Sequence, residues 1–174
     1  MPWNPETGAL LMYHHTMRYA WAMQFVGGLH VVDLGCGCGY GSFMLSWAAK
    51  SVVGLDLSPA AVDFAQRHYA GPNVEYRLCN VEQGPVPQAD LYVAFEMLEH
   101  LVEPLALLEK LCAPLVWSVP VLNTSTYHKH VYSEKRVRHE FNAKLVYYQM
   151  PNGLIVHSGQ VRGMAMYMIG YRDV

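Results

Sequence analysis

The chain has 174 residues, which is the size of one domain, so we predict a single domain over residues 1–174. Hydrophobic residues make up 52% of the sequence and charged residues 15%, which excludes a disordered chain. The formal net charge is -2, so the composition does not favour a nucleic-acid partner. No apolar run approaches the ~18 residues of a membrane span, and the N-terminus lacks a signal core.

The cysteines favour a cytoplasmic protein. Cys36 and Cys38 are one residue apart, which is neither the CxxC spacing of a redox pair nor that of a zinc site. Cys79 and Cys112 stand alone in the sequence. We therefore expect four reduced thiols and a cytoplasmic location, with no membrane partner.

Short β-rich runs alternate with helix-like segments along the chain, a pattern that predicts an α/β fold with a mainly parallel sheet. The predicted helices cover residues 13–26, 42–50, 59–69, 104–111 and 142–150. The predicted strands cover residues 30–34, 51–57, 74–78, 90–95, 115–119, 154–157 and 164–171. We expect the last two strands to be antiparallel to each other.

Three segments carry further expectations. Residues 142–150 alternate well enough for a strand, but a parallel sheet needs a crossover helix at this place, so we predict a helix capped by Asn142. Residues 1–28 form the N-terminal helix region. The polar residues 121–141 are expected to form a long loop.

The glycine-rich stretch after the first predicted strand is the most informative motif. Gly35, Gly37, Gly39 and Gly41 alternate with other residues directly after an apolar run. Glycines let the backbone turn sharply and approach a ligand closely, and the N–H groups of the following helix start point toward that ligand. Four interior glycines are entropically costly, which favours a ligand-binding loop over a plain turn.

The spacing of the glycines indicates the kind of ligand. A dinucleotide fingerprint needs glycine at its sixth position, where this sequence has Tyr40 in one register and Ser42 in the other. Asp33 precedes the glycines, and Asp56 ends the second predicted strand, where a carboxylate can accept hydrogen bonds from both ribose hydroxyls. The pattern favours a nucleoside without a pyrophosphate.

Four motifs in order resemble the class I S-adenosylmethionine-dependent methyltransferases over about residues 6–171. They are VVDLGCGCGYG, VVGLDLS, RLCNVEQGPVP and LYVAFEMLEHLVEP, and the last is particularly similar to the ubiquinone-biosynthesis O-methyltransferase branch. This resemblance implies a Rossmann-like, doubly wound sheet of seven mostly parallel strands with an antiparallel last strand. It also implies S-adenosyl-L-methionine as cofactor.

The resemblance implies where the cofactor binds. The residues that it assigns to cofactor binding are Tyr19, Asp33, Gly35, Cys36, Gly37, Tyr40, Asp56, Leu57, Asn80, Val81, Phe95 and Glu96. Asp56 is implied to hold the ribose, Leu57 to cover one adenine face, and Arg18 or Tyr19 to contact the cofactor carboxylate. Asn80 replaces a commoner aspartate at the adenine edge, and its carbonyl oxygen can still accept from the adenine amino group.

The EMLEH segment supplies the first candidates for catalysis. If this stretch is helical, Glu96, Glu99 and His100 share one helix face. They then serve as base and acceptor-orienting groups, hold a divalent cation, or play a structural part. In the ubiquinone-type relatives the motif is associated with magnesium.

The second group of candidates lies in the loop over residues 121–141. Ligands of open α/β sheets bind beyond the carboxyl ends of the strands, so this loop is expected to overhang the cofactor and form most of the acceptor site. His128 and His130 are the candidate bases there. An ordinary exposed loop is the competing interpretation.

The sequence therefore predicts an enzyme that transfers a methyl group from S-adenosylmethionine to an oxygen or nitrogen of a small-molecule acceptor. A regulatory or non-catalytic protein that binds the same cofactor is the alternative. The two differ in whether a methylated product forms.

Overall fold

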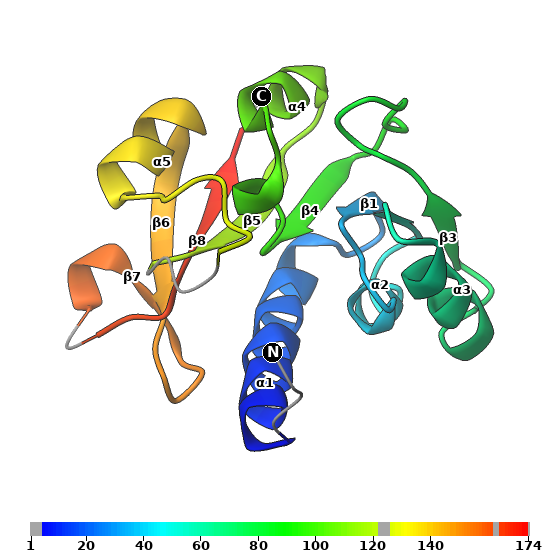
Figure 1. The fold of residues 1–174 in the computed structure, drawn as a ribbon, viewed down its shortest axis with the longest axis horizontal. Helices are drawn as coiled ribbons and strands as arrows, with labels where there is room; N and C mark the ends of the chain where they lie inside the picture. Colours follow the sequence, from blue (N-terminus) through cyan, green and yellow to red (C-terminus); the bar gives the residue numbers. More distant parts are fainter. Residues whose placement is uncertain (1–4, 122–125, 162–163, 174) are drawn as a thin grey trace.

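The computed structural model describes residues 5–121, 126–161 and 164–173 and shows an eight-stranded sheet (Figure 1). The strands are β1 (His30–Leu34), β2 (Ser51–Asp56), β3 (Val74–Leu78), β4 (Leu91–Phe95), β5 (Leu115–Pro120), β6 (Ala143–Gln149), β7 (Ile155–His157) and β8 (Tyr167–Arg172). Their order is β3-β2-β1-β4-β5-β8-β6-β7. The first five strands are parallel, β8 is antiparallel to β5, and β6 is antiparallel to both β8 and β7.

Helices cover both faces of this sheet. They are α1 (Pro5–Ala22), α2 (Tyr40–Leu45), α3 (Pro59–His68), α4 (Pro104–Lys110) and α5 (Glu134–Glu140), with short 3-10 turns η1 (Met23–Phe25), η2 (Leu98–His100) and η3 (Ser158–Gln160). Figure 1 shows α1, α2 and α3 on one side of the sheet and α4 and α5 on the other. Each side has its own apolar core. Among the described residues, no helix has both the length and the apolar character needed to cross a membrane.

The predicted α/β class and the first five strands are confirmed. Every residue of β4 is buried, as expected of a strand covered on both faces. The predicted start of α3 is also confirmed, because the Ser58 side chain accepts a hydrogen bond from the Ala61 N–H and Pro59 occupies the first turn.

The predicted helix over residues 142–150 is wrong, because these residues form β6 and raise the strand count from seven to eight. The crossover that the sheet requires is made earlier, by α5, which lies inside the predicted loop 121–141 and begins at a Ser133 cap. With the crossover already complete, the alternating pattern of residues 143–149 is free to pair as a strand.

The antiparallel orientation predicted for the last two strands relative to each other is also wrong, because β7 and β8 run parallel to each other. β7 and β8 do not contact each other as a pair but flank β6 on either side, each antiparallel to it. The predicted antiparallel orientation of the last strand relative to the parallel part of the sheet is confirmed by its pairing with β5.

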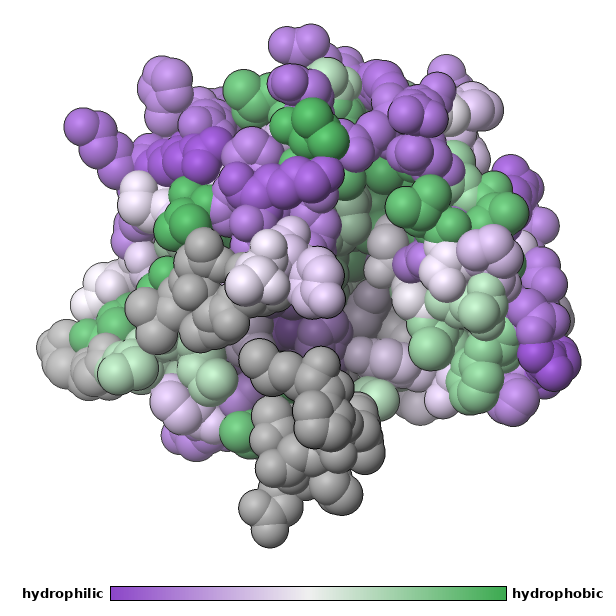
Figure 2. All heavy atoms as spheres, in the orientation of Figure 1, coloured by the Kyte–Doolittle hydropathy of each residue, from purple (hydrophilic) through white to green (hydrophobic). Residues whose placement is uncertain are grey.

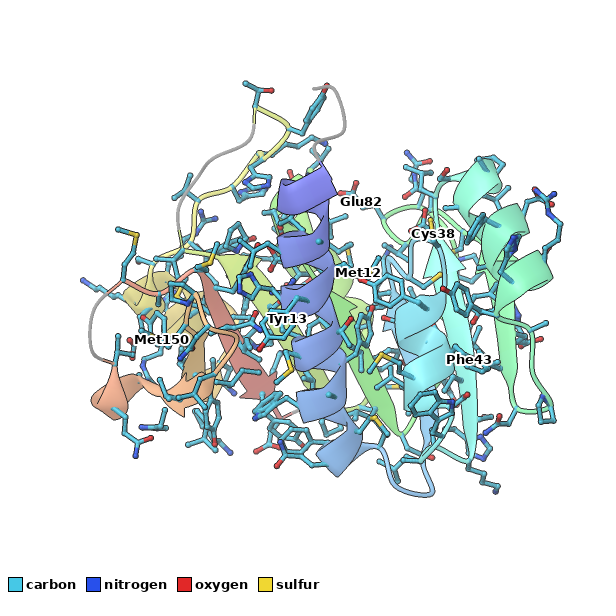
Figure 3. All side chains as sticks on the ribbon, turned by 90° about the horizontal axis from the view of Figure 1, so that it is seen from below. Met12, Tyr13, Cys38, Phe43, Glu82 and Met150 are labelled. Carbon is cyan, nitrogen blue, oxygen red and sulfur yellow. The ribbon has the colours of Figure 1, made fainter. Side chains whose placement is uncertain are left out.

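Polar contacts attach α1 to the antiparallel half of the sheet. Arg18 is fully buried and donates to Gln149 Oε1 at 2.6 Å, while Gln149 Nε2 donates to the His14 carbonyl at 3.0 Å. The Tyr13 hydroxyl donates to the Asn152 carbonyl at 3.0 Å, on the side of α1 that faces Met150 in Figure 3. These bonds fix the helix across the carboxyl ends of β6 and the central strands.

Gly170 offers a test of the packing between β5 and β8. It lies directly opposite Trp117, and a Cβ at residue 170 would come within 2.2 Å of the Trp117 ring. We expect Gly170→Ala to lower the free energy of unfolding in urea by about 1–3 kcal/mol through overpacking. Gly27→Ala is the control, because no atom lies within 4 Å of its added Cβ. Equal stabilities of the two variants would contradict the close packing.

Candidate active site

The glycine loop between β1 and α2 has a backbone that requires glycine. Gly35, Gly37 and Gly39 have φ values of 75°, 55° and 88°, a region that other residues seldom adopt. A Cβ on Gly39 would also lie 2.5 Å from the Ala65 Cβ, and one on Gly35 would lie 2.6 Å from the Met97 side chain. The loop is therefore held close to both α3 and the segment after β4.

Asp33, near the end of β1, fixes the start of this loop by hydrogen bonds. Its fully buried carboxylate accepts hydrogen bonds from the Ser42 hydroxyl at 2.6 Å and the Tyr19 hydroxyl at 3.2 Å. Burial raises the pKa of Asp33 to about 6, against the opposing effect of these two hydrogen bonds. Asp33 thus joins β1 to α1 and α2, and it does not line the cavity described below.

Asp56 ends β2 with its carboxylate fixed by the backbone. Oδ2 accepts from the Gly37 N–H and Oδ1 from the Ser58 N–H, each at 2.8 Å. Each oxygen retains a further lone pair, so the side chain can still accept hydrogen bonds from a ligand. The glycine loop and the acidic residue are therefore directly connected.

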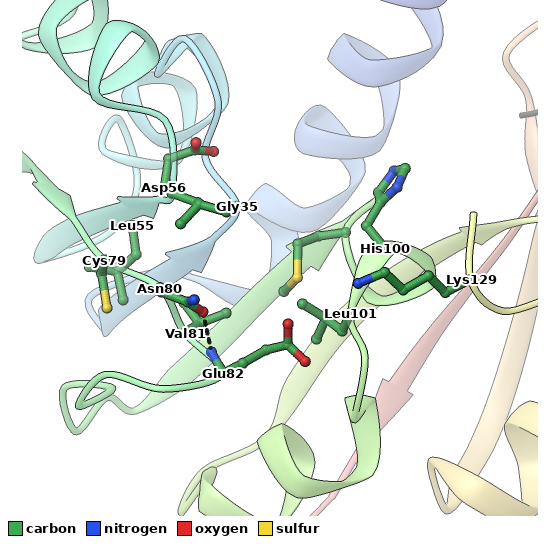
Figure 4. A pocket seen from close by; sticks show the side chains of 12 residues that line it. Gly35, Leu55, Asp56, Cys79, Asn80, Val81, Glu82, His100, Leu101 and Lys129 are labelled. Atoms are coloured by element: carbon green, nitrogen blue, oxygen red, sulfur yellow. Dashed lines mark hydrogen bonds between the residues drawn. The ribbon is translucent and has the colours of Figure 1, made fainter. Parts of the chain in front are cut away.

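A cavity of about 260 Å³ opens beyond the carboxyl ends of β1, β2 and β3 (Figure 4). Of the residues predicted to bind the cofactor, Gly35, Asp56, Leu57, Asn80 and Val81 line it. The candidate base His100 and its neighbour in space Lys129 also line the cavity. The wall further includes residues that the sequence reasoning did not select, namely Leu55, Cys79, Glu82, Met97 and Leu101. Most of these residues are next to a selected residue in the sequence. Their position directly beside the motif residues is the signal from which they could have been predicted.

The loop after β3 closes one end of the cavity. The Glu82 N–H donates to Asn80 Oδ1 at 3.0 Å, drawn as a dashed line in Figure 4. The Glu82 carboxylate accepts from the N–H groups of Val102 and Glu103 at 2.8 and 3.0 Å. This network ties the loop after β3 to the start of α4.

The remaining predicted cofactor residues do not line this cavity. The Tyr19 ring packs edge-on against Phe95 and Tyr40, with ring centroids 5.0 and 5.9 Å apart. Cys36 is buried, and burial raises the pKa of its thiol, so it stays protonated. Gly37 contributes its N–H to Asp56.

Glu96 and Arg18 form a second polar centre at the carboxyl end of β4. Glu96 has a φ of 53°, and its Oε1 accepts from the Ser118 hydroxyl at 2.8 Å. Burial raises the pKa of Glu96, while the positive charge of Arg18 opposes this shift. The Arg18 guanidinium lies 4.1 Å from the centroid of the Tyr167 ring, and its Nε and Nη2 atoms are buried with no partner among the described residues.

The condition under which Glu96, Glu99 and His100 would share one helix face, a helix over this stretch, is not met. The left-handed backbone of Glu96 interrupts the segment, and only Leu98–His100 form a 3-10 turn. Within the described chain, the one carboxylate and imidazole group with metal-ligand spacing is instead Glu99, His100 and His128, whose ligand atoms lie within 4.8 Å of one another. Glu96 is not part of it, so the expected cation set is not assembled.

Glu99 and His128 are incompletely satisfied in this group. Both carboxylate oxygens of Glu99 and the Nδ1 atom of His128 are buried without a partner in the described part of the chain. Burial, reinforced by the charge of Glu96, raises the pKa of Glu99 to about 8. His100 is exposed, and its Nε2 lies 3.9 Å from Glu99 Oε1. An acid of raised pKa thus lies beneath an accessible imidazole.

Both ring nitrogens of His130 contact other groups of the protein. Its Nε2 is 3.1 Å from the Leu101 carbonyl, and its Nδ1 is 3.4 Å from Arg136 Nη2. With both ring nitrogens engaged, His130 is not placed to take a proton from an acceptor, contrary to the expectation from sequence.

Figure 2 shows the surface of the molecule in the orientation of Figure 1. This face is hollowed near its centre, with hydrophilic residues inside the hollow.

Comparison with known proteins identifies the domain type. Residues 31–115 match a family model described as a methyltransferase domain. The ubiquinone biosynthesis O-methyltransferase of Bordetella avium is 33% identical over 123 residues, which cover 66% of this chain and 51% of that protein. A probable S-adenosylmethionine-dependent methyltransferase of Mycolicibacterium smegmatis is 35% identical over 89 residues, which cover 50% of this chain and 34% of that protein. The chain therefore spans about half the length, or less, of these curated relatives.

Solved structures share the fold. A magnesium protoporphyrin IX methyltransferase from Synechocystis PCC 6803 with bound SAH has a TM-score of 0.69 at 19% identity, covering 99% of this chain and 90% of that chain. The N-methyltransferase NodS from Bradyrhizobium japonicum WM9, in complex with S-adenosyl-l-homocysteine, has a TM-score of 0.68 at 19% identity, with 98% and 88% covered. The solved structures show the fold, and the family match together with the sequence relatives shows that the chain belongs to the class I S-adenosylmethionine-dependent methyltransferases.

Proposed function

We propose that this protein binds S-adenosylmethionine in the cavity beside the glycine loop and transfers its methyl group to an oxygen or nitrogen of a small-molecule acceptor. The observation that carries the proposal is the connection between Gly37 and Asp56, which presents a fixed carboxylate beside the glycine loop. Such a carboxylate suits the two hydroxyls of a ribose. The cofactor supplies a methyl group on a sulfonium, which is already activated for displacement.

Arg18 is suited to the carboxylate of the cofactor's amino-acid tail. Nε–H and one Nη2–H of a guanidinium point the same way and form a fork that matches a carboxylate. In Arg18 this fork is buried and unpartnered among the described residues, while Nη1 donates to Gln149. Because a buried donor without a partner is costly, a bound anion would stabilise this arrangement.

His100 is the base that the geometry favours. Its Nδ1 lies 3.3 Å from the Tyr127 carbonyl, an acceptor, so Nδ1 carries the proton and Nε2 holds the lone pair. Nε2 accepts a proton from the acceptor hydroxyl or ammonium. Glu99 Oε1 lies 3.9 Å from Nε2, and because burial raises the pKa of Glu99 to about 8, Glu99 stabilises the resulting imidazolium in the ionised form that prevails above that pH. We place His128, whose ring centroid is 4.9 Å from that of His100, in an orienting role.

Asp56 tests the cofactor site. We expect Asp56→Ala to weaken S-adenosylmethionine binding at least tenfold, or about 1.4 kcal/mol, measured by calorimetry. The matched control is Asp63→Ala, which removes an exposed carboxylate from α3. Unchanged affinity would exclude Asp56 from the ribose role. Binding of NADH in place of S-adenosylmethionine would overturn the proposed function as a whole.

His100 tests the catalytic assignment. We expect His100→Ala to slow methyl transfer about 100-fold with little change in cofactor affinity, because a general base acts on the rate of the chemical step. Turnover is followed as S-adenosylhomocysteine formed with a panel of phenols, alcohols and amines. His139→Ala, in an exposed position on α5, is the control. A normal rate in His100→Ala would transfer the role of base to His128, and no product with any acceptor would support the non-catalytic alternative.

The raised pKa of Glu99 predicts that the stability of the fold depends on pH. Its pKa is raised to about 8 in the folded protein, above the ordinary value of 4.5, so folding takes up a proton between these pH values. The free energy of unfolding should therefore fall as pH rises from 5 to 8, by up to about 1.4 kcal/mol per pH unit from this group. Glu99→Gln should remove that contribution.

Urea unfolding at pH 5, 6.5 and 8 measures the difference between wild type and variant, in which the contributions of the other titrating groups, such as Asp33, cancel. Glu109→Gln, an exposed position on α4, should follow the wild type. Parallel pH profiles of Glu99→Gln and wild type would show that Glu99 titrates normally.

A further inference from the structure

A second cavity lies at the opposite end of the parallel strands from the candidate active site. It has a volume of about 310 Å³, and its walls include Phe25, Leu29, Asp90, Leu145, Tyr147 and Tyr171. Asp90 directly precedes β4 and Tyr171 lies near the end of β8, so the cavity opens at the amino ends of the parallel strands. The glycine loop and Asp56 lie at their carboxyl ends, so the two cavities are separate.

Aromatic rings form three walls of this cavity. Phe25 comes from η1, Tyr147 from β6 and Tyr171 from β8, which is adjacent to β6 in the sheet (Figure 1). The Phe25 and Tyr171 ring centroids are 5.9 Å apart. Trp21 supports two of the walls, with its ring centroid 4.9 Å from that of Phe25 and 5.2 Å from that of Tyr147. The rings come from three elements and are held by packing.

The charge of the cavity is negative. Asp90 lies at its exposed rim. Its Oδ2 accepts a hydrogen bond from the His30 N–H at 2.9 Å, and its Oδ1 can interact with a ligand. None of the lining residues in the described chain is basic. The neighbouring Lys144 ammonium donates to Asp173 at 2.9 Å. The carboxylate at the rim is thus not neutralised from within the cavity.

We propose that this cavity binds a small organic cation with a quaternary ammonium head. The faces of aromatic rings attract a cation, by about 0.5–1 kcal/mol each at an exposed site, and a carboxylate at the rim adds to the attraction. A quaternary head has no N–H groups to satisfy, which suits walls made of aromatic rings and aliphatic carbon. Its methyl groups also bury apolar surface against Leu29 and Leu145. This proposal does not depend on the proposed methyl transfer.

Choline and its neutral isostere 3,3-dimethyl-1-butanol test the role of charge, because they differ only in nitrogen against carbon at the branch point. Titrations of the full chain are followed by chemical-shift changes of the Trp21 indole N–H. We expect choline to bind with a millimolar dissociation constant and the neutral isostere to bind at least fivefold more weakly. Equal affinities would reduce the site to an apolar pocket and overturn the proposal.

Matched variants test the residues. Tyr147→Phe keeps the ring and should keep choline binding, whereas Tyr147→Leu should weaken it at least fivefold. Asp90→Asn keeps an acceptor for the His30 N–H but removes the charge, and should also weaken binding. Phe64→Leu, an exposed ring on α3, is the control. Thermal unfolding checks that each variant is folded.

The same experiments identify the outcomes that overturn the proposal. Choline affinity that is unchanged by both Tyr147→Leu and Asp90→Asn would place the binding elsewhere. Absence of binding at 50 mM choline, together with a dimer in sedimentation that Leu145→Lys dissociates, would assign this surface to a second copy of the chain.

Discussion

The hydrogen bonds to the buried carboxylate of Asp33 are the interaction on which the active-site half of the structure depends. It accepts hydrogen bonds from α1 through Tyr19 and from α2 through Ser42, and so joins two helices to β1 at the root of the glycine loop. A buried carboxylate is costly unless its oxygens are satisfied, so the three elements must meet for the arrangement to be stable. Both the loop and the cavity beside it derive their positions from this junction.

Much of the fold follows from local sequence. Continuous apolar runs such as β1 and β4 identify the parallel strands, and the glycine spacing with Asp56 identifies one wall of the cavity. β6 was not predictable in this way, because its alternating pattern suits either a strand or a helix and the choice depends on where the crossover lies. That crossover is α5, a helix of only seven residues in a polar segment, which carries a weak signal in sequence.

The candidate catalytic residues illustrate the same limit of local patterns. Spacing within EMLEH suggested one helix face, but the backbone of Glu96 breaks the helix and separates it from Glu99 and His100. The partner that completes the group, His128, comes from a loop 28 residues further along the chain. Likewise, His130 cannot be distinguished from His128 in sequence, since only the folded chain brings Arg136 and the Leu101 carbonyl to its ring.

The alternation within the glycine loop divides its positions into two kinds. At Gly35, Gly37 and Gly39 the peptide torsions themselves exclude side chains, whereas Cys36 is inward-facing and fills space next to Gly54. Cys38 alone in this stretch is solvent-exposed and carries neither restriction. A label on the Cys38 thiol therefore displaces neither the backbone nor a packed side chain, which makes this residue a suitable attachment point for a chemical reporter beside the ligand loop.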